Sequence, residues 1–284
     1  MIPPTFDYTA PETIEDALRA LAEAGEDAKI IAGGQSLMPV LRLRMNDPNV
    51  VIDLGRIPEL RGIREEGDNL VIGAMTTHYD VIHDPLVRAH AALLVEAATT
   101  VADPQIRHRG TLGGAVAHAD PAGDLSAPVL ALGATMTIAG PNGRREVAAQ
   151  DFFQDLFTTA IEPDEILAAI TIPKHTGWSA HYEKFNLTAQ AWSVVAVAAA
   201  LKVSGGKIEQ ARVALTNMAN VPLRAAGVEE SLIGRNADAE TIRAAAARAA
   251  EGTDPNSDGD ADAGYRTHLA QVLTGRAVAA AAGL

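Results

Sequence analysis

The chain has 284 residues, of which 48% are hydrophobic, and its formal net charge is −13, from 36 acidic and 23 basic residues. This length and apolar content indicate a globular protein with a sizeable core, as one large domain or two to three small ones. Non-specific nucleic-acid binding needs a basic face, which this acidic chain is not expected to have. The chain contains no cysteine, which excludes disulfides, iron–sulfur clusters and cysteine-based zinc sites on it.

Neither the start of the chain nor its longest apolar run predicts export or membrane insertion. Met1-Ile2-Pro3-Pro4 lacks the basic and apolar regions of a secretory signal. The run from Ala191 to Leu201 contains Ser193 and is too short to span a bilayer. We therefore expect a soluble protein in the cytoplasm.

Residues 5 to 55 predict a small β-α-β unit. Apolar residues at helical spacing follow the start signal Pro11-Glu12-Thr13 and predict a helix through Ala24. One apolar strand begins at Lys29, and a second spans Asn49 to Leu54. Two strands joined through helical segments are typical of a β-α-β unit.

A tandem glycine turn lies at the centre of this unit, in Lys29-Ile30-Ile31-Ala32-Gly33-Gly34-Gln35-Ser36. Ile30 to Ala32 predict a buried strand, and the apolar residues 37–43 predict the start of a helix. Paired glycines allow positive φ angles and the close approach of a ligand, and the amides of such a turn can face an anion. We hypothesise that the turn holds the diphosphate of a dinucleotide; the alternative is an ordinary strand-to-helix turn.

Between residues 57 and 173 the pattern changes to short strands and apolar helices. The strands are predicted at 60–63, 69–72 and 165–172, and a hairpin joins 134–138 to 145–148 across Gly140-Pro141-Asn142-Gly143. The helices are predicted at 79–83, with Thr77 as the cap, at 86–99 and at 125–132.

A second glycine pair follows this apolar segment, in Thr111-Leu112-Gly113-Gly114-Ala115. It lies about eighty residues after the first pair, and basic residues precede it. Neither pair matches the dinucleotide-binding G-x-G-x-x-G pattern or the G-x-x-x-x-G-K-[ST] phosphate loop. Two such loops could nevertheless hold one extended diphosphate from two sides.

The region from 174 to the end predicts a hairpin followed by helices. A strand is predicted at 181–185, and strands at 196–203 and 207–215 flank Ser204-Gly205-Gly206, a structural hairpin turn. Helices are predicted at 224–233, 239–250 and 265–282.

Other polar groups predict little chemistry. His118, Asp120 and Asp124 could bind a metal, but such residues in a loop more often cap the chain or bind a ribose hydroxyl. The segment 254–260 resembles half of a calcium loop, but Tyr265 stands where the bidentate glutamate belongs, which favours a flexible acidic loop. No nucleophile elbow, HExxH motif or catalytic triad is present, so a hydrolase has little support.

The two glycine loops and Asp124, in this order and spacing, resemble the FAD-binding medium subunit of the molybdenum hydroxylases, the family that includes xanthine dehydrogenase and aerobic carbon monoxide dehydrogenase. The resemblance covers nearly the whole chain, and Arg212-Val213-Ala214-Leu215-Thr216-Asn217-Met218 is most like carbon monoxide dehydrogenase. It implies an α+β protein with a FAD-binding fold of the vanillyl-alcohol-oxidase/PCMH type. Residues 1–56 and 57–173 would form two FAD-binding subdomains, and 174–284 a C-terminal α+β domain with a small antiparallel sheet and helices.

The resemblance also implies which residues bind FAD. Both glycine segments would surround the diphosphate, and Asp124 would accept a hydrogen bond from the dinucleotide. Leu167 and Val101 would lie by the isoalloxazine, Lys184 near its polar edge, and Trp192 against the ring, although the residues before Trp192 differ from those of many relatives. No catalytic residue and no metal ligand are expected on this chain. The implied cofactor-binding residues are Lys29, Ile30, Ile31, Ala32, Gly33, Gly34, Gln35, Ser36, Val101, Thr111, Leu112, Gly113, Gly114, Ala115, Asp124, Leu167, Lys184 and Trp192.

The implied function is that of an oxidoreductase subunit. Substrate, carbon monoxide above all, would be oxidised at a molybdenum–pterin cofactor on a large subunit. Electrons would pass through two [2Fe–2S] clusters on a small subunit to FAD here and then to a quinone or other acceptor. The complex is expected to be a cytoplasmic dimer of heterotrimers, able to associate with the inner face of the membrane.

Three alternatives stay open. The same subunit could serve a complex that acts on purines or aromatic N-heterocycles. The chain could also be a stand-alone FAD oxidoreductase with its own substrate pocket. In a third case it is a non-catalytic binding or assembly module whose glycine loops are only turns.

Overall fold

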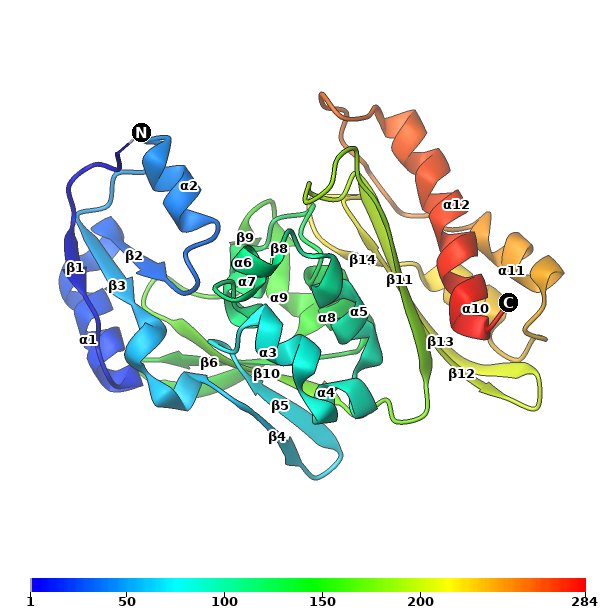
Figure 1. Cartoon of the computed structure of the whole chain (residues 1–284), viewed down its shortest axis with the longest axis horizontal. Coiled ribbons are helices and arrows are strands. Elements are labelled where there is room, and N and C mark those ends of the chain that lie inside the picture. Colours follow the sequence, from blue (N-terminus) through cyan, green and yellow to red (C-terminus); the bar gives the residue numbers. More distant parts are fainter. Residues whose placement is uncertain (1) are drawn as a thin grey trace.

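The computed structural model describes residues 2–284, and across that range the strands form three larger sheets and one two-stranded ribbon. The three sheets follow one another along the long axis of the molecule in chain order (Figure 1). This mixture of a parallel sheet, antiparallel sheets and segregated helices is an α+β architecture.

The N-terminal sheet is parallel and has the order β1-β3-β2, with β1 at Asp7–Thr9, β2 at Ala28–Ile31 and β3 at Val50–Asp53. Helix α1 (Ile14–Ala24) begins at Thr13, whose hydroxyl accepts the amide of Asp16, and it buries Ile14, Ala17 and Leu21. The short helix α2 (Leu37–Arg42) follows the first glycine turn. The 3₁₀ turns η1 (Gly25–Asp27), η2 (Leu54–Arg56) and η3 (Pro58–Leu60) complete this part of the chain.

The second sheet is antiparallel, with the order β4-β5-β10-β6-β7. Its strands are β4 (Ile63–Glu66), β5 (Asn69–Gly73), β6 (Thr135–Gly140), β7 (Gly143–Ala148) and β10 (Ile166–Pro173). Strands β8 (Phe153–Asp155) and β9 (Thr158–Thr159) form the ribbon. The helices of this region are α3 (His78–His83), α4 (Pro85–His90), α5 (Ala92–Thr100), α6 (Pro104–Arg107), α7 (Leu112–His118), α8 (Ser126–Ala131) and α9 (Ala149–Phe152).

The third sheet is antiparallel, with the order β11-β12-β13-β14. Its strands are β11 (Ser179–Phe185), β12 (Val195–Ser204), β13 (Lys207–Thr216) and β14 (Leu223–Arg224), and its helices are α10 (Ala226–Leu232), α11 (Ala239–Ala246) and α12 (Ala263–Ala282). Strand β12 is buried on both faces. Ala196, Ala198 and Ala200 belong to the core shared with the second sheet, whereas Val195 and Val197 pack with α10 to α12.

Helices α5 and α8 lie between the second and third sheets and contact β12 (Figure 1). Their apolar residues join β5, β10 and β12 in one continuous core. Because this core spans both regions, the side chains that face it from either sheet are held in fixed relative positions.

Most of the elements expected from the sequence are confirmed. The hairpin at Gly205-Gly206 pairs β12 with β13, and both glycines have positive φ angles. The single helix expected over 86–99 is wrong, because the chain breaks at Ala91 into α4 and α5. The break frees the carbonyl of His90 to accept the amide of His175 at 2.8 Å. Across residues 2–284, no helix has both the length and the apolar character needed to cross a membrane.

Candidate functional site

A cavity of about 780 Å³ lies between the N-terminal sheet and the second glycine segment. Its volume falls within the range of roughly 300–1,000 Å³ that is usual for sites of small molecules and cofactors. Six of the residues expected from the sequence to bind a cofactor line it, namely Ile31, Ala32, Gly33, Gly34, Gln35 and Thr111. The cavity therefore brings together parts of both glycine segments, which are about eighty residues apart.

The first glycine turn lies directly against the backbone that precedes the second. A methyl group added at Gly33 would lie 2.7 Å from the Cα of Gly110 and closer still to the carbonyl oxygen of Arg109. Gly34 has a φ of +75°, which a side chain would strain. Glycine is thus required at both positions, for contact between the loops at Gly33 and for conformation at Gly34.

The backbone amides of the first turn are open. Among residues 2–284, no acceptor is hydrogen-bonded to the N–H groups of Gly33, Gly34, Gln35 and Ser36. A buried or half-buried amide without a partner is uncommon in folded proteins. Four adjacent donors, three of them on residues that line the cavity, therefore form a site suited to an anionic oxygen-rich group.

The second glycine segment uses its amides inside the protein. Leu112 N donates to Thr76 O and Gly113 N to Ala74 O, each at 2.9 Å, and Gly114 N donates to the Thr111 hydroxyl at 3.0 Å. Gly113 also packs tightly against Ala74, where a methyl group would lie 2.7 Å from the Cα. These glycines permit close packing of α7, and a role of this segment in holding a diphosphate stays a prediction.

Four arginines line the cavity: Arg42, Arg56, Arg61 and Arg109. None of them forms an ion pair with a carboxylate anywhere in the described chain. Asp53 is the acidic residue of the lining, and its carboxylate already accepts the Tyr8 hydroxyl at 2.6 Å and the Gly55 amide at 2.7 Å. In a chain of net charge −13, this cavity is locally cationic and suited to a polyanion.

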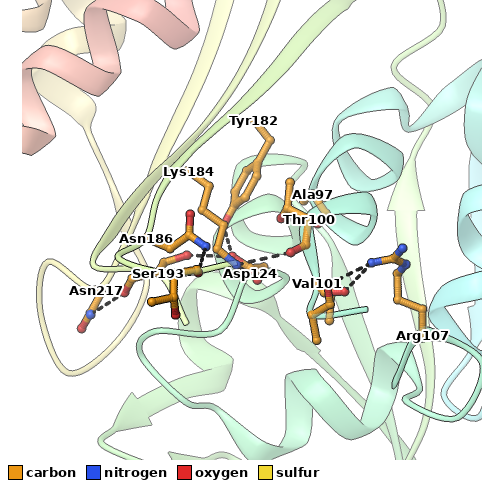
Figure 2. Close-up of polar contacts among 12 residues, drawn as sticks. Ala97, Thr100, Val101, Arg107, Asp124, Tyr182, Lys184, Asn186, Ser193 and Asn217 are labelled. Atoms are coloured by element: carbon orange, nitrogen blue, oxygen red, sulfur yellow. Dashed lines mark hydrogen bonds and ion pairs between the residues drawn. The ribbon is translucent and has the colours of Figure 1, made fainter. Parts of the chain in front are cut away.

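A second group of predicted residues lies around the buried carboxylate of Asp124, whose contacts Figure 2 shows. The Asp124 carboxylate accepts hydrogen bonds from the Tyr182 hydroxyl at 3.0 Å, the Ser193 hydroxyl at 2.7 Å and the Lys184 ammonium at 2.8 Å. Burial raises the pKa of the Asp124 carboxyl, and Lys184 and the two hydroxyls partly oppose that shift. Burial also raises the pKa of the Tyr182 phenol, which keeps it a neutral donor.

Two contacts connect this cluster to the cavity. The Lys184 ammonium lies 3.4 Å from the carbonyl oxygen of Thr100 at the end of α5. The carbonyl oxygen of the next residue, Val101, accepts the Arg107 guanidinium at 2.7 Å (Figure 2). Arg107 belongs to the segment whose next residues, His108 and Arg109, line the cavity. The Asp124 cluster and the cavity are thus linked through residues 100–109 of the chain.

The other predicted residues lie in varied surroundings. Leu167 on β10 is buried in the core between the second and third sheets, whereas Trp192 is 56% exposed in the loop before β12. Lys29 on β2 is exposed, Ile30 packs on the N-terminal core, and Ala115 on α7 is half-buried. Their roles toward a flavin stay predictions.

The polar groups that could have bound a metal have protein partners. Asp124 accepts the three donors described above, and Asp120 accepts the amide of Ala122 at 2.9 Å. The His118 ring lies 5.1 Å from the ring of Phe157. In the acidic loop, Asp258 accepts the buried guanidinium of Arg266 at 2.6 Å, so that carboxylate fixes the loop to α12.

Several residues of the site were missed from the sequence. The four cavity arginines lie in different loops and helices and follow no local pattern, so nothing in the sequence groups them. Tyr182 and Ser193 also went unassigned. Tyr182 was recognisable as a strand residue two positions before Lys184, but its contact with Asp124 spans 58 residues.

The comparisons with known proteins agree with this arrangement. Residues 4–175 match the family described as "FAD binding domain in molybdopterin dehydrogenase", and residues 180–281 match "CO dehydrogenase flavoprotein C-terminal domain". The cavity residues fall in the first match, and the Asp124 cluster draws on both.

Individual relatives are similar over their whole length. The carbon monoxide dehydrogenase medium chain of Afipia carboxidovorans is 44% identical, covering 98% of this chain and 97% of that one. A structure of carbon monoxide dehydrogenase from Hydrogenophaga pseudoflava is 44% identical, with a TM-score of 0.96 over 99% of this chain and 98% of that one. Quinoline 2-oxidoreductase from Pseudomonas putida 86 is 35% identical, with a TM-score of 0.95 over 100% and 99% of the two chains. The chain therefore belongs to the FAD-binding flavoprotein subunits of the molybdopterin dehydrogenases, as an oxidoreductase subunit that has the carbon monoxide dehydrogenase type of C-terminal domain.

Proposed function

We propose that this chain is the FAD-carrying medium subunit of a molybdenum-containing carbon monoxide dehydrogenase. Its partners are a large subunit with the molybdenum–pterin cofactor and a small subunit with two [2Fe–2S] clusters, in a dimer of heterotrimers. Electrons reach FAD on this chain from the clusters and leave to a quinone or a similar acceptor. The identity of 44% to carbon monoxide dehydrogenase chains, against 35% to quinoline 2-oxidoreductase, supports this assignment.

The observation that carries the proposal is the row of open amides in a cationic cavity. The N–H groups of Gly33 to Ser36 would bind the diphosphate, and the guanidinium groups of Arg42 and Arg109 would offset its negative charge. When bound, FAD supplies an acceptor and donor of one or two electrons. The chain itself holds the dinucleotide, keeps its charge neutralised and excludes water from one end through Leu167 and the core around it.

The proposal extends to the residues expected at the flavin end of the site. Lys184 would present its ammonium at the polar edge of the ring, where a cation favours the anionic reduced form. Val101, which follows α5, and Trp192, in the loop before β12, would contact the ring when FAD is bound. Lys184 is nearly buried, with 7% of its side chain exposed, so its charge acts through a medium of low dielectric constant.

The test is the composition and activity of the protein purified with its native partners. Mass spectrometry is expected to find two further chains, and the visible spectrum to show flavin together with iron–sulfur absorption. Reduction of a dye by carbon monoxide is expected, with no reduction by xanthine or quinoline. A colourless assembled protein that takes up no flavin overturns the proposal.

A complex that acts on aromatic N-heterocycles is the second candidate, because the TM-score to quinoline 2-oxidoreductase is 0.95, almost the value for carbon monoxide dehydrogenase. In both complexes the substrate site lies on another subunit in this proposal, so the fold of this chain does not discriminate between them. Dye reduction by quinoline without activity on carbon monoxide would select this candidate. Flavin-dependent oxidase activity without partner chains would select a stand-alone enzyme instead.

A further inference from the structure

Asp124 and Lys184 form a buried ion pair across the seam between the second and third sheets. Asp124 lies two residues before the start of α8, and Lys184 lies on β11, sixty residues later in the chain. Their side chains are 4% and 7% exposed, and their charged atoms are 2.8 Å apart. The pair therefore exists only when the two regions are assembled.

The carboxylate has all its partners on the third-sheet side. Oδ1 accepts the hydroxyls of Tyr182 and Ser193, and Oδ2 accepts the Lys184 ammonium. Backbone contacts hold the same seam, since Asn217 N donates to Pro121 O at 2.9 Å. Protein donors thus reach both carboxylate oxygens, and the expected role of Asp124 as an acceptor for the dinucleotide stays a prediction.

Stability alone does not account for such a pair. Removing two charges from water is costly, and apolar residues of the same volume often stabilise a protein equally well or better. We therefore look for a functional role of the buried Lys184 ammonium, beyond any contribution to stability. The Lys184 ammonium also contacts Thr100 O, beside Val101, at the point where the cluster meets the segment that borders the cavity.

We propose that Asp124 is a positioning residue, which holds the Lys184 ammonium at the flavin end of the site and offsets its charge there. The inference rests on the proposed function, both for the binding of FAD to this chain and for the place of Lys184 beside the ring. In the native protein the pair is neutral overall. Loss of Lys184 leaves one negative charge, loss of the carboxylate leaves one positive charge, and loss of both restores neutrality.

The net charge of the pair in each variant predicts the order of the flavin midpoint potentials. Because reduction adds negative charge to the flavin, a net positive charge nearby raises the midpoint potential and a net negative charge lowers it. We expect the midpoint potential to fall in Lys184→Met, to rise in Asp124→Asn, and to return towards the native value in Asp124→Asn/Lys184→Met. The measurement is spectroelectrochemical titration of the flavin in the purified complex.

Two control variants distinguish the effect of a changed charge from that of a disturbed structure. Ser193→Ala removes one hydrogen bond to Asp124 but keeps both charges, so its flavin potential is expected to stay at the native value. Lys202→Met removes an exposed lysine on β12 that pairs with Glu209, and no shift is expected. The FAD content of each variant is measured by release and absorbance.

The outcomes are distinguishable. A double variant whose potential is no nearer the native value than that of Lys184→Met, at equal FAD content, overturns the positioning role. If one single variant does not assemble, the other decides: a fall of the potential in Lys184→Met or a rise in Asp124→Asn supports the proposal, and an unchanged potential at equal FAD content overturns it. A native complex without FAD overturns the proposed function itself.

Discussion

Gly33 offers the sharpest test of the cavity, because alanine there adds one methyl group at the contact between the two loops. That methyl would lie 2.7 Å from the Cα of Gly110 and nearer still to the carbonyl oxygen of Arg109, so backbone must move. Overpacking of this kind costs about 1–3 kcal/mol. If the strain is relieved by separating the loops, the dissociation constant for FAD rises about 5- to 150-fold.

The assay is titration of the flavin-depleted complex with FAD, followed by the quenching of flavin fluorescence. Gly275→Ala is the matched control, because the same methyl group in α12 would meet the Cβ of Ala246 at an ordinary 3.6 Å. Gly33→Ala with an unchanged dissociation constant would refute the view that contact between the loops shapes the FAD site. Equal weakening in Gly275→Ala would point to a general loss of folding instead.

Three further predictions address charge and stability. In Arg109→Gln, loss of a cavity cation worth about 1 kcal/mol weakens FAD binding about fivefold at low salt and less at high salt, whereas Arg243→Gln on α11 has no effect in the same titration. Burial lowers the pKa of His78 to about 4, so the folded protein loses stability as pH falls below the unfolded pKa of 6.5. By pH 5 this loss is about 2 kcal/mol; His78→Leu removes it, and His83→Leu on the exposed face of α3 retains it, in thermal melts across that range. Arg266→Met costs about 2 kcal/mol in denaturant unfolding, because Val194 O and Asp258 each lose a charged donor; an unchanged midpoint would contradict that role.

The local elements were predictable because they depend on neighbours in sequence. Thr13 and Thr77 cap α1 and α3 through hydrogen bonds to amides three residues later. The turn at Gly205-Gly206 needs positive φ angles, and both glycines have them. The exception is Ala91, where an otherwise helical pattern breaks and the carbonyl of the preceding residue, His90, accepts the amide of His175 from far along the chain.

Two glycine bends after apolar segments, the lack of cysteine and the resemblance to a family of flavoprotein subunits could all be read from the order of residues alone. The open amides of Gly33 to Ser36, the satisfied amides of Leu112 to Gly114 and the contact of Lys184 with Asp124 could be found only in the folded chain. A bend or a cap forms among adjacent residues and is therefore predictable from them. Whether a donor keeps an open face, and which charges share a buried seam, depends on which distant segments pack against it.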